Sequence, residues 1–127
     1  MAEHIEIGKI GEQIAHSFLM KHGFSLLDQN YRTPYGEIDI VAEKNGITHF
    51  VEVKSKKTHD LTVAHETTYR PEENVHSEKQ KRLIRVINTF IAEKHVQEGR
   101  WQFDIVSVYL DSDKKQAKVT FLENIIL

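Results

Sequence analysis

Residues 36–54 read GEIDIVAEKNGITHFVEVK, and this stretch predicts a β-hairpin. Two runs that are rich in β-branched residues, 37–43 and 47–54, lie on either side of Asn45-Gly46. Asn-Gly is the strongest short-range hairpin signal, because both residues of the turn need a positive φ. A symmetric turn at this point fixes the register: the residue numbers of each opposed pair have the same sum as the two turn residues.

The predicted register brings charged side chains of the two strands together. Asp39 faces Glu52 and Glu37 faces Lys54, unless a bulge adds a residue to one strand. Two carboxylates whose Cβ atoms are roughly 5 Å apart on one strand pair destabilise a sheet. Either one of them takes up a proton or a cation binds between them. The other face of the hairpin carries an apolar set: Ile38 opposite Val53, and Ile40 opposite Val51.

A divalent metal ion would suit the two carboxylates, because Mg²⁺ prefers one or two carboxylates together with waters and phosphate oxygens. Lys54 follows Glu52 on the same side of its strand, where its ammonium group could bind a phosphate oxygen or help to position an attacking water. The alternative from spacing alone is an exposed Glu37–Lys54 ion pair, with Asp39 and Glu52 facing solvent.

The rest of the chain predicts one α/β domain, residues 1–127, with a single mixed sheet flanked by helices. An amphipathic helix over 3–22 ends at Gly23, a typical left-handed cap. Capping-box residues at 77–80 begin a second helix that runs to about 97, with Leu83, Ile84, Ile87, Phe90 and Ile91 as its buried stripe. The remaining elements are strands at 24–31, 101–110 and 117–122, and a long polar loop at about 55–76, a length that is typical of functional or mobile loops.

Small residues surround Glu12 on the first helix. Gly8, Gly11 and Ala15 lie at helical spacing around it. Each glycine inside a helix costs about 1 kcal/mol relative to alanine, so two of them indicate close packing against a neighbouring backbone. Glu12 would then be held near that contact; the alternative is a glutamate on the polar edge of a surface helix.

Composition limits the possible partners. The chain has 39% hydrophobic and 28% charged residues, as in ordinary globular proteins, and its net charge of −2 gives no general attraction to nucleic acid. Binding would need local basic clusters, such as Lys56 and Lys57 or Lys79 and Arg82, although charge runs on helices also occur as solvated faces. The absence of cysteine, of a basic leader and of a membrane-spanning apolar run favours the cytoplasm.

Several short motifs together resemble the YraN-like family, small bacterial proteins related to archaeal Holliday-junction resolvases and to the restriction-endonuclease-like fold. The similarity extends from about Gly8 to Val108. Its motifs are Gly11-Glu12-Gln13-Ile14-Ala15, Gly23-Phe24, Asn30-Tyr31-Arg32, Gly36-Glu37-Ile38-Asp39, Phe50-Val51-Glu52-Val53-Lys54, Lys79-Gln80, Arg82-Leu83 and Phe103-Asp104-Ile105-Val106.

The resemblance implies a Mg²⁺-dependent endonuclease (or one that uses Mn²⁺) acting on DNA, with branched DNA as a candidate substrate. It makes Asp39 and Glu52 metal ligands, with the Val53 carbonyl as a third ligand. Lys54 becomes the catalytic lysine, and Glu12 the helix carboxylate that joins the metal site. Lys56, Lys57, Lys79 and Arg82 would contact the DNA backbone.

Departures from the family pattern concern the DNA contacts more than the metal site. Lysines follow Lys54 where an arginine is usual, and Gln102 replaces another arginine. The loop is long and contains His59, His65 and His76, whose irregular spacing is weak evidence for metal binding. A non-catalytic nucleic-acid-binding module or an adaptor of the same fold therefore stays open. Junction cleavage needs two sites and hence a homodimer, which the sequence does not demonstrate.

Overall fold

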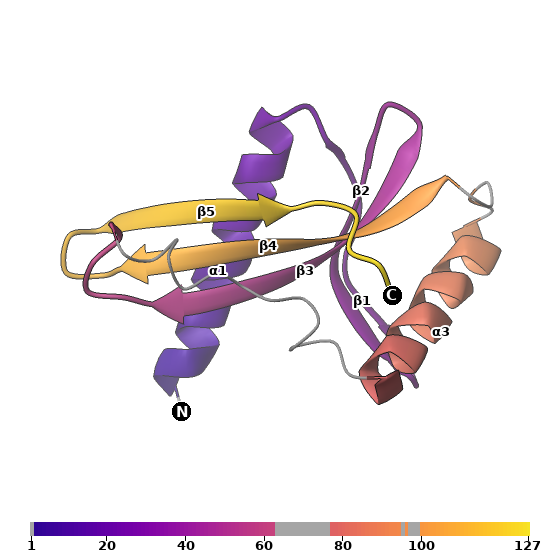
Figure 1. Ribbon diagram of the computed structural model, residues 1–127, viewed down its shortest axis with the longest axis horizontal. Coiled ribbons are helices and arrows are strands. Elements are labelled where there is room, and N and C mark those ends of the chain that lie inside the picture. The colour runs from indigo at the N-terminus through magenta and orange to yellow at the C-terminus, as the bar shows by residue number, and fades with distance from the viewer. Residues whose placement is uncertain (1, 63–76, 95, 97–99) are drawn as a thin grey trace.

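The computed structural model describes residues 2–62, 77–94, 96 and 100–127, and within them the predicted order of helices and strands is confirmed (Figure 1). The five strands form one sheet in the order β1-β2-β3-β4-β5, parallel between β3 and β4 and antiparallel elsewhere. The elements are α1 (Ala2–Lys21), β1 (Ser25–Thr33), β2 (Gly36–Lys44), β3 (Ile47–Lys57), α3 (Ser77–Lys94), β4 (Trp101–Asp111) and β5 (Gln116–Leu122). The sheet is thus mixed, as predicted.

The two helices of the described residues, α1 and α3, cover opposite faces of the sheet, and each has its own apolar cluster (Figure 1). α3 packs on β2, and α1 packs on β3 and β4. The α3 cluster contains Phe50, Ile87, Phe90 and Phe103, and the α1 cluster contains Leu19, Ile40, Val51 and Val106. Neither of these two helices is long and apolar enough to cross a membrane.

The turn at Asn45-Gly46 sets the register of β2 and β3 as predicted. Both residues have a positive φ, 53° and 78°. The ladder runs from Lys44–Ile47 to Ile40–Val51, and every pair in it has the predicted sum. The local sequence alone therefore determines how this hairpin begins.

Farther from the turn, β2 and β3 diverge, and we call this point the fork. β2 goes on beside β1 to the pair Thr33–Gly36, whereas β3 goes on beside β4 to the pair Lys57–Leu110. In Figure 1, β3 turns toward β4 and β5 while β2 continues with β1. The fork begins just before the expected pairs Asp39–Glu52 and Glu37–Lys54, so the prediction of direct pairing at these positions is wrong.

The side-chain alternation of β2 is also interrupted at Asp39. Ile38 belongs to the cluster under α3, whereas Ile40 belongs to the cluster under α1, together with Val51 and Val53. In a regular strand, residues two apart point to the same face. The predicted apolar set therefore holds for Ile40 and Val51 but not for Ile38 opposite Val53, because the two strands have already separated there.

Three smaller predictions need correction. The loop begins later than position 55, because β3 keeps pairing with β4 as far as Lys57, and its residues 63–76 lie outside the described part. α3 ends at Lys94 instead of about 97. Its buried stripe includes Val86 where Ile84 was expected, since Ile84 is only partly buried.

A buried polar pair joins β3 to β4. The His49 ring nitrogen Nδ1 lies 2.6 Å from Asp104 Oδ2, and both side chains are almost fully buried. The other carboxylate oxygen of Asp104 accepts hydrogen bonds from the backbone N–H of Asn124 and from the side-chain amide of Gln102, at 2.9 and 2.8 Å. Asp104 thus anchors the segment after β5 to the sheet, with every oxygen bonded.

Candidate metal and phosphate site

Asp39 lies at the base of the fork and caps a backbone group that the diverging strands leave unpaired. The Val53 N–H donates a hydrogen bond of 2.8 Å to Asp39 Oδ2. Burial raises the pKa of Asp39 from 3.8 to about 6, against the opposing effect of this hydrogen bond. Burial is the largest cause of this rise to about 6, and the negative charges of Glu12, Glu52 and Glu37, in decreasing order, contribute the rest. The surroundings of Asp39 therefore disfavour its ionised form, and a cation bound there would stabilise that form.

α1 brings Glu12 to the same place, and Gly11 makes this approach possible. A Cβ added to Gly11 would come within 1.7 Å of Ser55 Oγ and 2.8 Å of Ser55 Cβ, so no larger residue fits without movement. The close contact predicted from the glycines is thus confirmed for Gly11, although its partner is the side chain of Ser55. It is wrong for Gly8, where an added Cβ would meet nothing within 4 Å.

Glu12 and Asp39 line one groove between α1 and the β1–β2 pair. Its volume is about 350 Å³, and most of its other lining side chains are polar. They include Lys9, His16, Gln29 and Asn30. A groove with hydrogen-bonding side chains beside two carboxylates suits a polar, charged ligand better than an apolar one.

Glu52 has one satisfied oxygen and one unsatisfied oxygen. Lys79 Nζ lies 3.0 Å from Glu52 Oε1. Glu52 Oε2 is buried and has no hydrogen-bond partner among the described residues. A buried carboxylate oxygen without a partner is costly, and it requires an explanation such as an ion that belongs there.

The Lys79–Glu52 contact was not predicted, because Lys79 was expected to face DNA. The helical periodicity of the sequence contained a signal for this contact. Lys79 lies one turn before Leu83, which is buried with Val86 on the face that packs on the sheet. Lys79 is therefore on the margin of the buried face of α3, where a long side chain can reach back to the sheet.

Sequence comparison places the chain among known proteins. The model of uncharacterised protein family UPF0102 matches residues 11–108. This chain belongs to that family. Relatives named UPF0102 protein include one from Chloroherpeton thalassium, 38% identical over 92% of this chain and 85% of the relative. Another is from Dictyoglomus thermophilum, 35% identical over 94% of this chain and 95% of the relative. The YraN-like resemblance is thereby confirmed.

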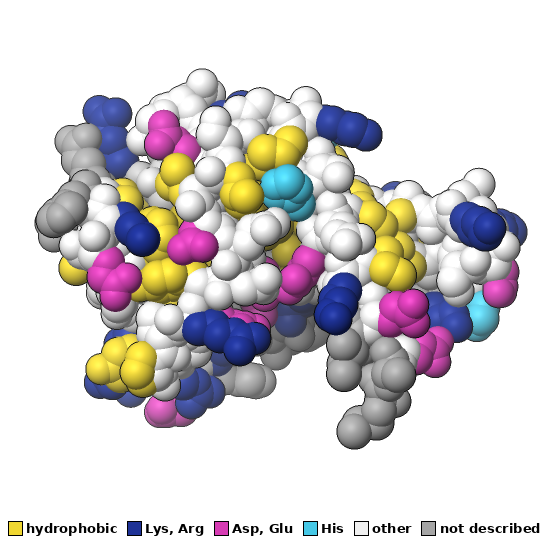
Figure 2. Space-filling view, turned by 180° about the vertical axis from the view of Figure 1, so that it is seen from behind, with side chains coloured by type: hydrophobic (Ala, Val, Ile, Leu, Met, Phe, Trp, Pro, Cys, Tyr) yellow, Lys and Arg dark blue, Asp and Glu magenta, His cyan; other side chains and the backbone are white. Residues whose placement is uncertain are grey.

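In this UPF0102 chain, the remaining residues of the predicted site lie in different surroundings. Lys54 is partly buried on β3. Lys56 and Arg82 are exposed, as a contact with DNA would require. Lys57 instead pairs with Glu3 of α1 at 2.9 Å. Figure 2 shows acidic and basic side chains interspersed on the face that it presents, without one continuous basic surface.

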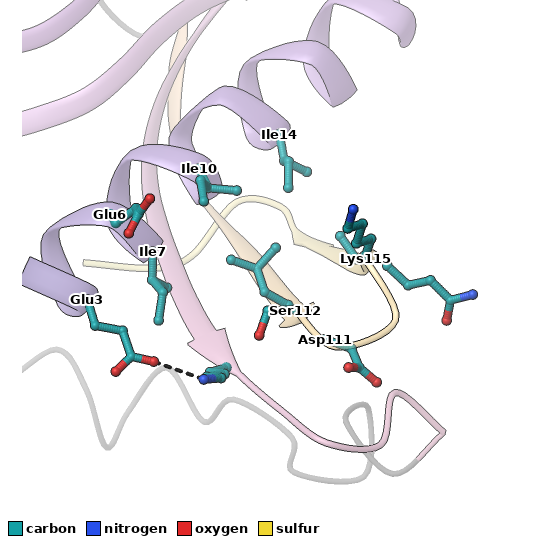
Figure 3. A pocket seen from close by; sticks show the side chains of 12 residues that line it. Glu3, Glu6, Ile7, Ile10, Ile14, Asp111, Ser112 and Lys115 are labelled. Carbon is teal, nitrogen blue, oxygen red and sulfur yellow. Dashed lines mark hydrogen bonds and ion pairs between the residues drawn. The ribbon is translucent and has the colours of Figure 1, made fainter.

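A second groove of the UPF0102 chain lies away from the carboxylates of the fork (Figure 3). It has a volume of about 480 Å³, between the first half of α1 and the β4–β5 turn. Ile7, Ile10 and Ile14 point into it, and the Glu3–Lys57 ion pair lies at its edge. Of the residues predicted for the site, this groove contains Lys57 alone.

The donor set at the fork fits a hard cation with few protein ligands. Among the described residues there is no group of three or more His, Cys, Asp or Glu side chains that could hold a metal ion. Mg²⁺ does not need such a group, because it commonly keeps several waters and uses one or two carboxylates plus phosphate oxygens. Asp39 and the oxygen of Glu52 that has no partner in the described part of the chain supply this kind of set. The Val53 carbonyl and Glu12 stay predicted ligands.

His59, the one loop histidine within the described residues, gives no support to a second metal centre. His59 is exposed, and its Nδ1 lies 3.9 Å from Asp113 Oδ2, a carboxylate that is also exposed. His65 and His76 lie outside the described residues. For these two histidines, the sequence evidence for metal binding, which their irregular spacing makes weak, stays untested.

Proposed function

We propose that this protein is a Mg²⁺-dependent endonuclease that hydrolyses phosphodiester bonds of DNA. The observation that carries the proposal is the buried oxygen of Glu52, which has no hydrogen-bond partner among the described residues. Burial and neighbouring negative charges, that of Glu52 among them, also raise the pKa of Asp39 to about 6. A divalent cation would relieve both features at once. A protein that only bound a polyanion would gain nothing from carboxylates gathered at its binding site.

In the proposed mechanism, Asp39 and Glu52 hold the cation, which when bound would activate a water and offset negative charge on the phosphate. The Val53 N–H fixes the orientation of the Asp39 carboxylate, so that its other oxygen is left for the cation. Lys54 follows Glu52 along β3 and positions the phosphate or the attacking water. Glu12 approaches from α1 and would add a further carboxylate to the metal site.

Substrate contacts would come from the surface around the fork. Lys56 and Arg82 are exposed and would neutralise phosphates of the DNA backbone. The polar groove beside Asp39 would receive the DNA strand that enters the site. Branched DNA is the candidate substrate, in which case two copies of the chain would act on one junction as a homodimer.

A second candidate function is a nucleic-acid-binding module without cleavage activity. The Lys79–Glu52 ion pair favours it, because Lys79 already neutralises part of the charge that would attract a metal ion. Such a module would bind DNA equally well with and without Mg²⁺. The two candidates therefore differ in a measurable property.

A cleavage assay tests the proposal directly. Duplex, single-stranded and four-way-junction DNA are incubated with Mg²⁺ or Mn²⁺ and the wild-type protein, Asp39→Ala or Lys54→Ala. Asp113→Ala, which removes an exposed carboxylate, is the matched control. We expect cleavage by the wild type and the control, and a loss of at least about a hundredfold in the two site variants. Binding without cleavage of any substrate would favour the second candidate, and absence of both would contradict each of them.

A further inference from the structure

The Lys79–Glu52 ion pair places a cation of the protein itself at the proposed metal site. Lys79 Nζ is 3.0 Å from Glu52 Oε1, and the two side chains are 34% and 22% exposed. The pair is thus half-buried, less screened by solvent than an ion pair on the open surface. Two other ion pairs, Lys57–Glu3 and Lys81–Glu78, are more exposed.

The helix fixes Lys79 at this position. Leu83, Val86 and Ile87 anchor the first half of α3 in the cluster that includes β2 and β3 residues. Lys79 lies one turn before Leu83, the first of these anchors. Its backbone therefore cannot drift away from Glu52, whereas its ammonium group, at the end of a flexible stem, can turn to a different acceptor nearby.

Lys79 and a divalent cation would compete for the same carboxylate. Glu52 Oε1 accepts from Lys79, while the buried Oε2 has no partner in the described structure. A cation bound at Oε2 would lie within a few ångströms of the ammonium group, where like charges repel strongly. The repulsion would disappear if the ammonium group moved to a substrate phosphate.

We propose that the Lys79 ammonium group pairs with Glu52 in the metal-free protein and moves to a DNA phosphate when the metal ion binds. This inference rests on the proposed function, since it assumes that Glu52 holds a metal ion. In this role Lys79 is a positioning residue that couples the binding of the metal ion to the binding of DNA. DNA draws Lys79 away from Glu52 and thereby strengthens metal binding, and by thermodynamic reciprocity metal strengthens DNA binding by the same factor.

The test measures Ca²⁺ binding by titration calorimetry, with and without a four-way-junction DNA that is checked afterwards for cleavage. Lys79→Met removes the charge and keeps an apolar stem of similar length, and Lys79→Arg retains the charge. Lys81→Met is the matched control, because Lys81 is an exposed lysine of the same helix, 3.9 Å from Glu78. Glu52→Gln removes a carboxylate that is proposed to hold the metal ion, and so tests the metal site itself.

Without DNA, we expect Lys79→Met to bind Ca²⁺ about two- to fivefold more tightly than the wild type, as removal of one partly exposed ion pair would give. The factor by which DNA tightens Ca²⁺ binding should fall in this variant. Lys79→Arg and Lys81→Met should retain the wild-type values. Melting curves recorded in parallel establish that each variant is folded.

Two other outcomes separate this inference from the proposed function. If Glu52→Gln abolishes Ca²⁺ binding but Lys79→Met binds like the wild type, the metal site stands and the role of Lys79 is overturned. If the wild type does not bind Ca²⁺, or if Glu52→Gln binds it equally well, the metal site itself is refuted and the role of Lys79 with it. If Lys79→Met does not fold, Lys79→Arg decides the test. A loss of the coupling between DNA binding and Ca²⁺ binding in Lys79→Arg would also overturn the inference.

Discussion

Asp39→Asn should stabilise the metal-free protein at neutral pH. Burial, followed by neighbouring negative charges, raises the pKa of Asp39 from 3.8 to about 6. Each pKa unit corresponds to about 1.4 kcal/mol, so the ionised carboxylate costs the folded state at most about 3 kcal/mol. Because water still reaches this partly exposed group, about 1–2 kcal/mol is the expected gain. Asparagine avoids the charge and keeps an oxygen that can accept from the Val53 N–H.

The pH dependence of the effect follows from the direction of the shift. Between pH 3.8 and about 6, the folded state keeps a proton that the unfolded state has lost, so stability falls as the pH rises. Below this window the carboxyl group is protonated in both states and costs nothing. Above it the cost is constant. The difference in unfolding free energy between Asp39→Asn and the wild type should therefore increase with pH across this window and be constant above it.

Chemical and thermal unfolding measure this prediction. At pH 7 in the presence of a chelator, 1–2 kcal/mol corresponds to a melting temperature higher by about 4–8 °C for a chain of this length. Asp113→Asn, at an exposed carboxylate, should change the melting temperature little. Added Mg²⁺ should raise the melting temperature of the wild type and not that of Asp39→Asn.

The reasoning about Asp39 would be refuted by a variant that is less stable than the wild type at pH 7 in the chelator. It would equally be refuted by a stability difference that is the same at pH 4 and pH 7. Either result would mean that the Asp39 carboxylate is well solvated or already paired within the protein.

Further predictions concern packing at two other positions. Gly11→Ala should destabilise the protein by about 1–3 kcal/mol in urea unfolding, because its Cβ would collide with Ser55, and Ser55→Gly should restore part of the loss. Gly8→Ala on the same helix should stabilise by about 0.5–1 kcal/mol, and an equal response of both glycines would contradict the close contact. Asp104→Ala should cost about 3 kcal/mol or more, because it leaves His49 without its buried partner; a change below 1 kcal/mol would show that the pair is dispensable.

The elements that the sequence predicts well are those with local causes. Asn45-Gly46 determines the turn and the first pairs of the hairpin, since the positive φ values are a property of these two residues. Gly23 ends α1 in a left-handed conformation, with a φ of 87°. Helical periodicity was sufficient to find both helices and most of the buried side chains of α3.

The parts that the sequence could not predict depend on contacts between distant segments. The fork exists because β2 remains paired with β1 as far as Gly36, while β3 remains paired with β4 as far as Lys57. A register argument confined to two strands contains neither constraint. The Lys79–Glu52 contact joins residues 27 positions apart through the packing of α3 on the sheet, and spacing alone does not reveal it.

The most direct test of the central claim is to locate the metal. Crystals of the protein soaked with Mn²⁺ would give an anomalous difference map of the fork. We predict one peak within bonding distance of Asp39 and of Glu52 Oε2, the buried oxygen for which the described residues provide no hydrogen-bond partner. If crystals soaked at a saturating Mn²⁺ concentration give no peak at the fork, or give peaks only at other carboxylates, the assignment of this site is contradicted.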